Sequence, residues 1–234
     1  MKIRIAELNI DVQHRYPLAA TLCAEYLSPF EEADISVCVS DAEIEREMSA
    51  AKEPVTAAEA EFACIYRNIA RTLPQFDAFV FHAATVAYKG QAFAFSAPSG
   101  TGKSTHVALW RQCFDEAYVL NGDKPIFRFL DGKLYAFGTP WCGKERMACN
   151  EGMPLVALAF LERSATNEIA PLSDDGAVRR LYHQVLMPGE DAQNLRFLDL
   201  LDAMLQTVPT YLLKCNMHPD AARVARDGMY KENL

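Results

Sequence analysis

The sequence lacks a long apolar segment and a recognisable leader. None of its apolar runs approaches the roughly 18–20 residues that are needed to cross a bilayer. The first residues, MKIRIAELNIDVQ, alternate between apolar and polar side chains and do not form the continuous apolar region of a signal peptide. We therefore expect a cytoplasmic protein that does not act in a membrane.

An excess of basic residues is also absent. The 234 residues include 23 Lys and Arg against 31 Asp and Glu, which gives a formal net charge of −8. A general nucleic-acid-binding protein needs a basic face that neutralises phosphates, and this balance argues against one. A local basic pocket, such as a nucleotide site, remains compatible with an acidic protein.

The cysteines have neither the number nor the spacing of a disulfide framework or a zinc site. There are seven of them, an odd number, and no two form a C-x-x-C pair. They are Cys23, Cys38, Cys64, Cys113, Cys142, Cys149 and Cys215. Half of all residues are hydrophobic and 23% are charged, the composition of an ordinary globular protein.

Five elements are expected in the first 75 residues. In the order β-α-β-α-α, they cover residues 2–8, 17–27, 33–40, 41–50 and 56–73. Thr56 is a candidate N-cap, Glu59 stands three residues later as in a capping box, and Pro74 marks the end of the last helix. We predict a small N-terminal α/β lobe over residues 1–75.

Strands outnumber helices in the rest of the chain. Residues 76–98 read as two strands joined near Lys89-Gly90, and residues 125–140 read as a hairpin that turns at Asp131-Gly132. The other expected elements are a helix to about Cys113, strands at 117–123, 154–162 and 210–216, and helices at 174–186, 192–207 and from about Pro219. We predict an α/β domain of α+β character over residues 76–234, built on a mixed β-sheet.

Residues 93–110, FAFSAPSGTGKSTHVALW, read as a strand, a loop and a helix that opens with Lys-Ser-Thr. The phosphate-binding template G-x-x-x-x-G-K-[ST] is matched by Gly102, Lys103 and Ser104, whereas Ala97 stands where the first glycine belongs. Alanine is the smallest replacement, and a loop that keeps a negative φ at this position would tolerate it. The sequence therefore predicts a P-loop.

Consecutive backbone N–H groups and the start of a helix favour a bound phosphate. The residues expected to contact the phosphates of ATP are Ser99, Gly100, Thr101, Gly102, Lys103, Ser104 and Thr105. The hydroxyl of Ser104 would also bind Mg²⁺. The alternative interpretation is a strand–turn–helix with a capping residue and no ligand.

Asp123 and His82 are candidates for chemistry on a phosphate. Asp123 ends an apolar strand in YVLNGDKP, and an acidic residue at the end of a neighbouring strand often holds Mg²⁺ or accepts the substrate proton in P-loop proteins. Asn121-Gly122 is equally a turn signal, which would make Asp123 a turn residue. His82 is expected inside an alternating strand, where a lone histidine is more often structural.

Lys144 and Arg146 follow a Gly-Thr-Pro-Trp bend. Either could stabilise the charge of a transferred phosphoryl group from a loop or contact the acceptor. Their alternative role is that of a solvated basic turn.

The segment from FHAATV through SGTGKST to YVLNGDKP resembles the catalytic domain of HPr kinase/phosphorylase, which belongs with the phosphoenolpyruvate carboxykinases. His82 stands where that family has a strand histidine, Lys103 and Ser104 match its P-loop, and Asp123 matches the second residue of its Asp pair. The resemblance implies a P-loop fold on a mixed β core, ATP and Mg²⁺ as cofactors, Asp123 as the catalytic acid/base, and a homo-oligomer.

The resemblance covers about residues 78–160, and this sequence departs from the family in informative places. Gly122 replaces the first Asp of the pair, and Thr105 replaces a Glu that commonly follows the P-loop Ser. The N-terminal lobe does not match the family's N-terminal domain. The residues GTPWCGKE resemble a subgroup of compact kinase-like bacterial proteins, some of which occur with peptide-modification systems.

These residues support an ATP-dependent kinase that acts on a Ser or Thr hydroxyl of a protein or peptide, or on a small hydroxyl compound. Lys103 and Asp123 favour this hypothesis, whereas Gly122 and Ala97 favour an ATP-binding adaptor that transfers no phosphate. A carboxykinase that acts on a keto acid ranks last, because the chain is far shorter than those enzymes.

Overall fold

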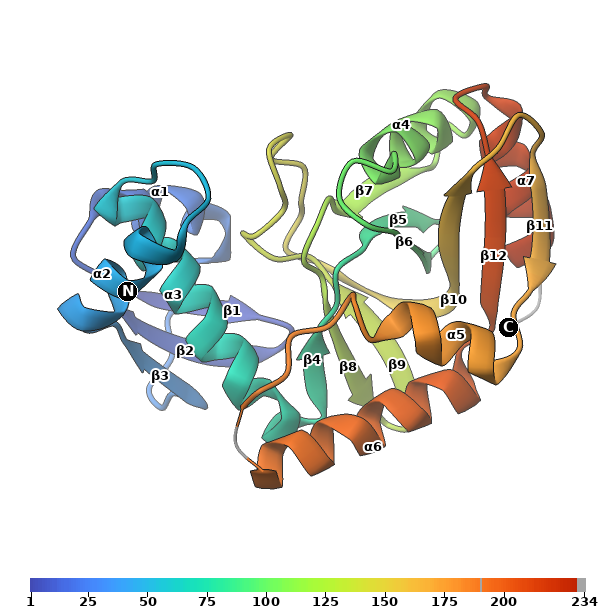
Figure 1. The fold of residues 1–234 in the computed structure, drawn as a ribbon. Helices are drawn as coiled ribbons and strands as arrows, with labels where there is room; N and C mark the ends of the chain where they lie inside the picture. Colours follow the sequence, from blue (N-terminus) through green and yellow to red (C-terminus); the bar gives the residue numbers. More distant parts are fainter. Residues whose placement is uncertain (190, 231–234) are drawn as a thin grey trace.

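The computed structural model describes residues 1–189 and 191–230, and Figure 1 shows an N-terminal lobe beside a larger body. The lobe contains β1 (Lys2–Ile5), β2 (Leu8–Gln13), α1 (Pro17–Leu22), the 3₁₀ turn η1 (Ala24–Tyr26), β3 (Ile35–Cys38), α2 (Asp41–Ala50) and α3 (Ala57–Thr72). Its three strands form a separate sheet in the order β1-β2-β3. β1 and β2 are antiparallel, and β2 and β3 are parallel.

Two expectations for the lobe are wrong in detail. The single strand expected over residues 2–8 is a hairpin, because Ala6 and Glu7 both adopt positive φ angles of 52° and 60° and reverse the chain. The helix expected over residues 17–27 ends at Leu22 and is followed by η1. The capping box at Thr56 and Glu59 is confirmed, since each side chain accepts a hydrogen bond from the other residue's backbone N–H.

The body is built on one large mixed sheet, as predicted. Its strands are β4 (Ala78–Val80), β5 (Ala84–Tyr88), β6 (Gln91–Ser96), β7 (Tyr118–Asn121), β8 (Ile126–Leu130), β9 (Lys133–Phe137), β10 (Gly152–Arg163), β11 (Glu168–Pro171) and β12 (Thr210–Cys215). The order is β4-β8-β9-β10-β6-β5-β7, with β12 also beside β10 and β11 beside β12. β10 pairs antiparallel with β9 through its first residues and parallel with β6 and β12 through the rest.

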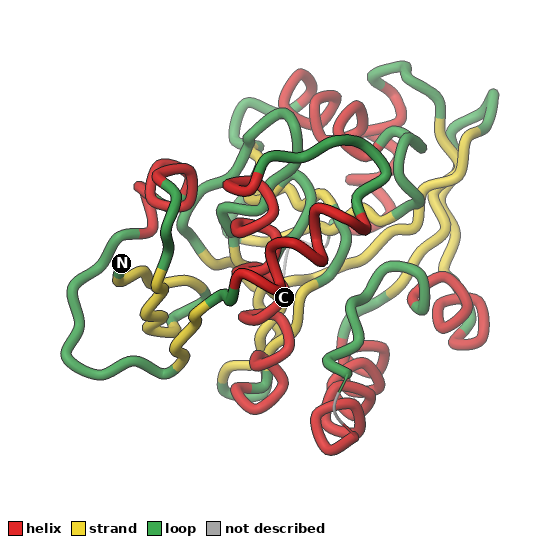
Figure 2. The backbone as a smooth tube through the Cα atoms, turned by 60° about the vertical axis from the view of Figure 1, so that its left-hand side comes forward, coloured by secondary structure: helices red, strands yellow, loops and turns green. Residues whose placement is uncertain are grey.

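Helices cover both faces of this sheet (Figures 1 and 2). α4 (Lys103–Cys113) and α7 (Asp220–Met229) lie on one face, and α5 (Asp174–Leu181) and α6 (Asp191–Thr207) lie on the other. The alternation in β6 follows from this arrangement. Phe93 and Phe95 pack toward α4, whereas Ala92 and Ala94 pack toward the core that includes α6.

The chain between residues 77 and 88 is not one strand. β4 pairs with β8, whereas β5 pairs with β6 and β7. The strand is interrupted between β4 and β5, at Phe81, His82 and Ala83. His82 therefore lies between two strands, which corrects its expected place inside one. The helix expected over residues 174–186 ends at Leu181, because the following residues turn to contact this break: the carbonyl of Gln184 accepts the N–H of His82, and Val185 bridges Phe81.

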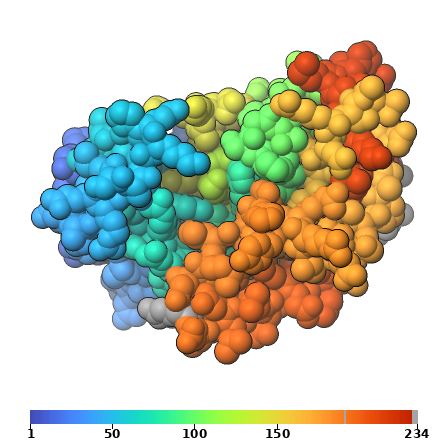
Figure 3. Space-filling model, in the orientation of Figure 1, coloured from blue at the N-terminus to red at the C-terminus, as the bar shows by residue number. Residues whose placement is uncertain are grey.

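The lobe packs directly on the body (Figure 3). Its core continues onto Ala78, Val80, Ile126 and Phe137 from β4, β8 and β9. The division at residue 75 stays a prediction. None of the described helices is long and apolar enough to span a bilayer.

Candidate functional site

The P-loop connects the end of β6 to the start of α4. Gly100 and Gly102 have φ angles of 78° and 125°, and glycine adopts these conformations without the strain that a Cβ would bring. The φ angle of Ala97 is not positive, and the residue is almost fully buried. Alanine therefore fits at the position where the template has glycine. The backbone is therefore compatible with a phosphate-binding loop despite this substitution.

Lys103 is the first residue of α4, and only 8% of it is exposed. Its Nζ donates a hydrogen bond to the carbonyl oxygen of Ala97 at 2.9 Å. Burial lowers the pKa of Lys103, and the nearby carboxylate of Asp123 acts in the opposite direction. Because α4 begins here, its unpaired N–H groups and this amine together favour an anion at the loop.

Arg163 also contacts the P-loop, although nothing in the sequence near it suggests this. It is the last residue of β10, and its guanidinium donates hydrogen bonds to the carbonyl oxygens of Gly100 and Thr101. Parallel pairing of β10 with β6 brings Arg163 to the end of the sheet from which the loop emerges. Both carbonyls point toward Arg163, which fixes the peptide groups at the tip of the loop.

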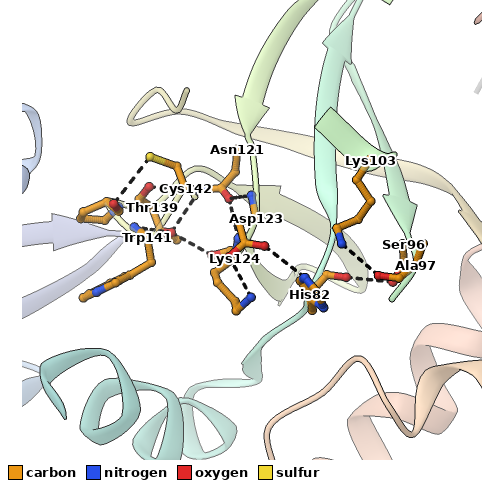
Figure 4. A network of polar contacts seen from close by, with 11 residues as sticks. His82, Ser96, Ala97, Lys103, Asn121, Asp123, Lys124, Thr139, Trp141 and Cys142 are labelled. Atoms are coloured by element: carbon orange, nitrogen blue, oxygen red, sulfur yellow. Dashed lines mark hydrogen bonds and ion pairs between the residues drawn. The ribbon is translucent and has the colours of Figure 1, made fainter. Parts of the chain in front are cut away.

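Asp123 contacts two side chains, His82 and Lys124, at the edge of this site (Figure 4). Its Oδ1 lies 3.1 Å from Nε2 of His82, and its Oδ2 lies 2.9 Å from Nζ of Lys124. The backbone N–H of Ala83 also donates to the carbonyl of Asp123. Burial alone would raise the pKa of Asp123, but His82 and Lys124 together lower it to about 2. The carboxylate is therefore ionised at neutral pH.

Asn121 fixes the turn that carries Asp123, a role that the sequence signalled only as a turn. β7 ends at Asn121 because its Oδ1 accepts the backbone N–H groups of Asp123 and Lys124. Its Nδ2 donates to both oxygens of Thr139. The hydroxyl of Thr139 in turn donates to the carbonyl of Lys124, so Asn121 is fully buried and tied to the loop that follows β9.

That loop also determines which residue can precede Asp123. A Cβ atom on Gly122 would lie 2.5 Å from the carbonyl oxygen of Cys142, closer than real Cβ contacts come. An aspartate therefore cannot occupy position 122 unless this backbone moves. The close approach of the Cys142 carbonyl therefore explains why glycine occupies position 122.

Lys144 and Arg146 lie on the same loop, and both side chains are exposed. Together with Asp123 they line a cavity of about 900 Å³ between the lobe and the body. A second cavity, of about 600 Å³, lies on the other side of the contact between His82 and Asp123. It is lined by His82, the start of the P-loop, and Arg179, Arg180, His183 and Gln184. His82 and Asp123 thus stand between two cavities.

The types of oxygen atom on Ser104 and Asp123 are compatible with Mg²⁺, and a metal site at these two residues stays a prediction. Among the described residues, no cluster of three or more His, Cys, Asp or Glu side chains could hold an ion by itself. Mg²⁺ usually binds through one or two protein oxygens together with substrate phosphates, and Ser104 and Asp123 offer a hydroxyl and a carboxylate of this kind.

Comparison with known proteins assigns the chain to a family. No curated protein matches it. One similar solved structure is the HPr(Ser) kinase/phosphatase from Coxiella burnetii, with 7% sequence identity, 64% of this chain and 95% of that chain covered, and a TM-score of 0.37. The family model described as SynChlorMet cassette protein ScmC matches residues 42–220, which include nearly all of α2, all of α3, the P-loop and Asp123. The chain therefore belongs to the ScmC family of SynChlorMet cassette proteins.

Proposed function

We propose that this protein is an ATP-dependent phosphotransferase that moves the γ-phosphate of ATP to a hydroxyl group, with a Ser or Thr of a protein or peptide as the acceptor. The observation that carries the proposal is a buried P-loop lysine, Lys103, near enough to Asp123 for that carboxylate to act on its pKa, together with the bond from His82 to the same carboxylate (Figure 4). A loop that only turned a strand into a helix would not need this pair beside it.

Each residue has a distinct role in such a transfer. The N–H groups of the P-loop and the Lys103 amine hold the β- and γ-phosphates. Asp123 orients the acceptor hydroxyl and takes its proton, while His82 and Lys124 fix the position of the carboxylate. Mg²⁺, bound through Ser104 and Asp123, would supply neutralisation of phosphate charge.

The low pKa of Asp123 is compatible with this role. A carboxylate with a pKa of about 2 is a weak base toward an alcohol. However, phosphoryl transfer passes through a loose transition state in which positioning and electrostatics supply most of the catalysis. The acceptor proton then leaves late, and orienting the hydroxyl is the main contribution of Asp123.

One observation favours a non-catalytic ATP-binding adaptor as the second candidate. Asp123 already has two side-chain partners, His82 and Lys124, and the position before it cannot hold a second carboxylate unless the backbone moves. An adaptor would use ATP to stabilise the body of the protein and would leave the phosphate on the nucleotide.

The two candidates differ in ATP turnover. The purified full-length chain is incubated with γ-labelled ATP, Mg²⁺ and a host lysate, beside Lys103→Ala and Asp123→Asn variants. A kinase labels an acceptor, Lys103→Ala abolishes both binding and labelling, and Asp123→Asn retains ATP binding but loses labelling. Tight ATP binding without any labelled acceptor or ADP would overturn the proposal and support the adaptor.

We place this activity in the cytoplasm, because ATP is abundant there and reduced cysteines persist. All seven cysteines are free thiols. The homo-oligomer implied by the resemblance is part of the same proposal, and light scattering on the purified protein tests it.

A further inference from the structure

The cavity of about 900 Å³ beside Asp123 is shared between the lobe and the body. Its walls come from α1, η1 and α3 on one side and from the turn at Asp123 and the loop after β9 on the other. The volume is within the range of sites that enclose a small molecule or a few residues of a peptide. The lobe therefore forms half of a cavity that reaches the proposed catalytic carboxylate.

Apolar and aromatic side chains make the lobe side of this cavity. Leu18 and Leu22 come from α1, and Phe62 and Tyr66 come from α3. Trp141 closes the wall, since its ring stacks on Phe62 with centroids 5.3 Å apart and its Nε1 donates to the carbonyl of Phe62. A ligand here meets a rigid apolar surface that is fixed to the loop carrying Lys144 and Arg146.

One polar atom in this wall has no partner. The side chain of Tyr26 is 3% exposed, and its hydroxyl makes no hydrogen bond to any described residue. A buried hydroxyl without a partner is unfavourable, because water no longer solvates it. Burial also raises the pKa of Tyr26, so the hydroxyl keeps its proton and is a donor. A ligand with a carbonyl or carboxylate oxygen would satisfy it if the side chains over this hydroxyl move aside, because the oxygen is closed off in this structure.

The charges around the cavity agree with a ligand of this kind. The carboxylate of Glu59 already accepts a hydrogen bond from Thr56 in the capping box, and Lys124 is already paired with Asp123. Glu25 is the other acidic side chain in the lining, whereas Lys144 and Arg146 place two cations at the exposed rim.

We infer that this cavity is the acceptor site and that it takes a hydroxyl group carried on an apolar frame together with a carbonyl or carboxylate. The inference rests on the proposed function and identifies its acceptor class. In the transfer, the acceptor oxygen bonds to the γ-phosphorus while the bond from that phosphorus to the β,γ-bridging oxygen breaks. ADP retains the electron pair of that bond, and the hydroxyl proton passes to Asp123.

Two sources carry this chemistry, and the experiment separates them. One pool contains blocked tripeptide amides with a central Ser or Thr and apolar neighbours, and the other contains free 3-hydroxy acids with apolar chains. Each pool is added with γ-labelled ATP, and transfer is measured. Binding is measured separately through tryptophan fluorescence in the presence of a non-hydrolysable ATP analogue, because Trp141 lines the cavity.

Tyr26→Phe is the decisive variant, because it removes the orphan hydroxyl and keeps the ring. We expect its thermal midpoint to equal or exceed that of the wild type, while the KM for the acceptor rises at least tenfold. Tyr118→Phe is the matched control, since its hydroxyl bonds to Glu151 outside the cavity and its loss should leave the acceptor KM within twofold. Leu22→Gln, which makes the apolar wall polar, should also raise the acceptor KM.

The outcomes distinguish this inference from the proposed function. Binding of a pool that Tyr26→Phe weakens, without any phosphate transfer, would support the cavity as a ligand site and defeat the kinase proposal. Phosphate transfer whose acceptor KM is unchanged in both Tyr26→Phe and Leu22→Gln would overturn the inference and leave the kinase intact. If neither pool binds or is phosphorylated, the acceptor class is wrong and the inference fails.

Discussion

The carbonyl oxygen of Cys142 occupies the space that a side chain on Gly122 would need. This contact links the turn before Asp123 to the loop after β9, and the hydrogen bonds between Asn121 and Thr139 hold the same two segments together. The shape of the site therefore depends on a close approach between two backbones, which a motif search does not report.

Gly122→Asp should lower stability and should not increase ATP turnover. The added side chain forces the backbone at Cys142 to move, and overpacking of this kind costs about 1–3 kcal/mol. We expect a lower free energy of unfolding in urea for Gly122→Ala and Gly122→Asp. Gly176→Ala is the control, because its Cβ would meet only side-chain atoms of Leu172 and Ser173, at 3.2 and 3.3 Å, and no backbone atom. Increased ATP turnover in Gly122→Asp would contradict this account.

Asp123 should make stability depend on pH in acid. Its folded pKa of about 2 lies below the ordinary value of 3.8, so its contribution is present above about pH 4 and is lost as the pH falls toward 2. We expect the free energy of unfolding of the wild type to exceed that of Asp123→Asn by on the order of 1–2 kcal/mol at pH 6, after allowance for the partial exposure of the carboxylate. Urea unfolding of both proteins between pH 6 and pH 2 measures the difference. A difference that stays constant over this range would contradict the assignment.

Arg163→Gln should weaken ATP binding without unfolding the protein. The variant loses the guanidinium bonds to the carbonyls of Gly100 and Thr101 and leaves the tip of the P-loop less ordered. Loss of about 1–2 kcal/mol corresponds to roughly a 5- to 30-fold increase in the dissociation constant. Titration with a fluorescent ATP analogue measures it, and Arg223→Gln on α7 serves as the control. An unchanged affinity of Arg163→Gln for the ATP analogue would show that the P-loop keeps its conformation without the bonds from Arg163.

Trp141 should contribute to stability through two separable contacts. Trp141→Phe keeps an aromatic ring beside Phe62 and Tyr66 but removes the bond from Nε1 to the carbonyl of Phe62, which we expect to cost about 1 kcal/mol. Trp141→Ala removes the stacking as well and should cost about 2–3 kcal/mol, since the side chain is partly buried. Urea unfolding compares both with the wild type, and equal losses in the two variants would argue against a stacking contribution.

Local patterns predicted those parts of the fold that local interactions determine. The capping box at Thr56, the turn at Asp131-Gly132 and the strand–loop–helix at Lys103 each depend on a few neighbouring residues, and all three are present in the structure. The turn at Ala6 and Glu7 could not be predicted, because neither residue favours positive φ.

Other features depend on contacts between distant segments. The break at His82 exists because Gln184 and Val185 bond there, and Arg163 reaches the P-loop because β10 pairs with β6. Tyr26 had no motif to indicate its place in a cavity wall. The periodicity and spacing of residues along the sequence carry no information about contacts between distant segments. Much of the candidate site could therefore not be predicted from the sequence.

β10 has a consequence for how this chain can be divided. Its 12 residues pair with β9 at one end and with β6 and β12 at the other, so one continuous strand is shared by both halves of the sheet. Cleavage of the chain within β10 would leave the neighbouring strands β9, β6 and β12 with unpaired backbone groups, and the two fragments should not reassemble readily. The exposed tip at Asp131-Gly132 is different, because only a turn is lost there. New chain ends for a circular permutant or a split reporter therefore belong at that tip.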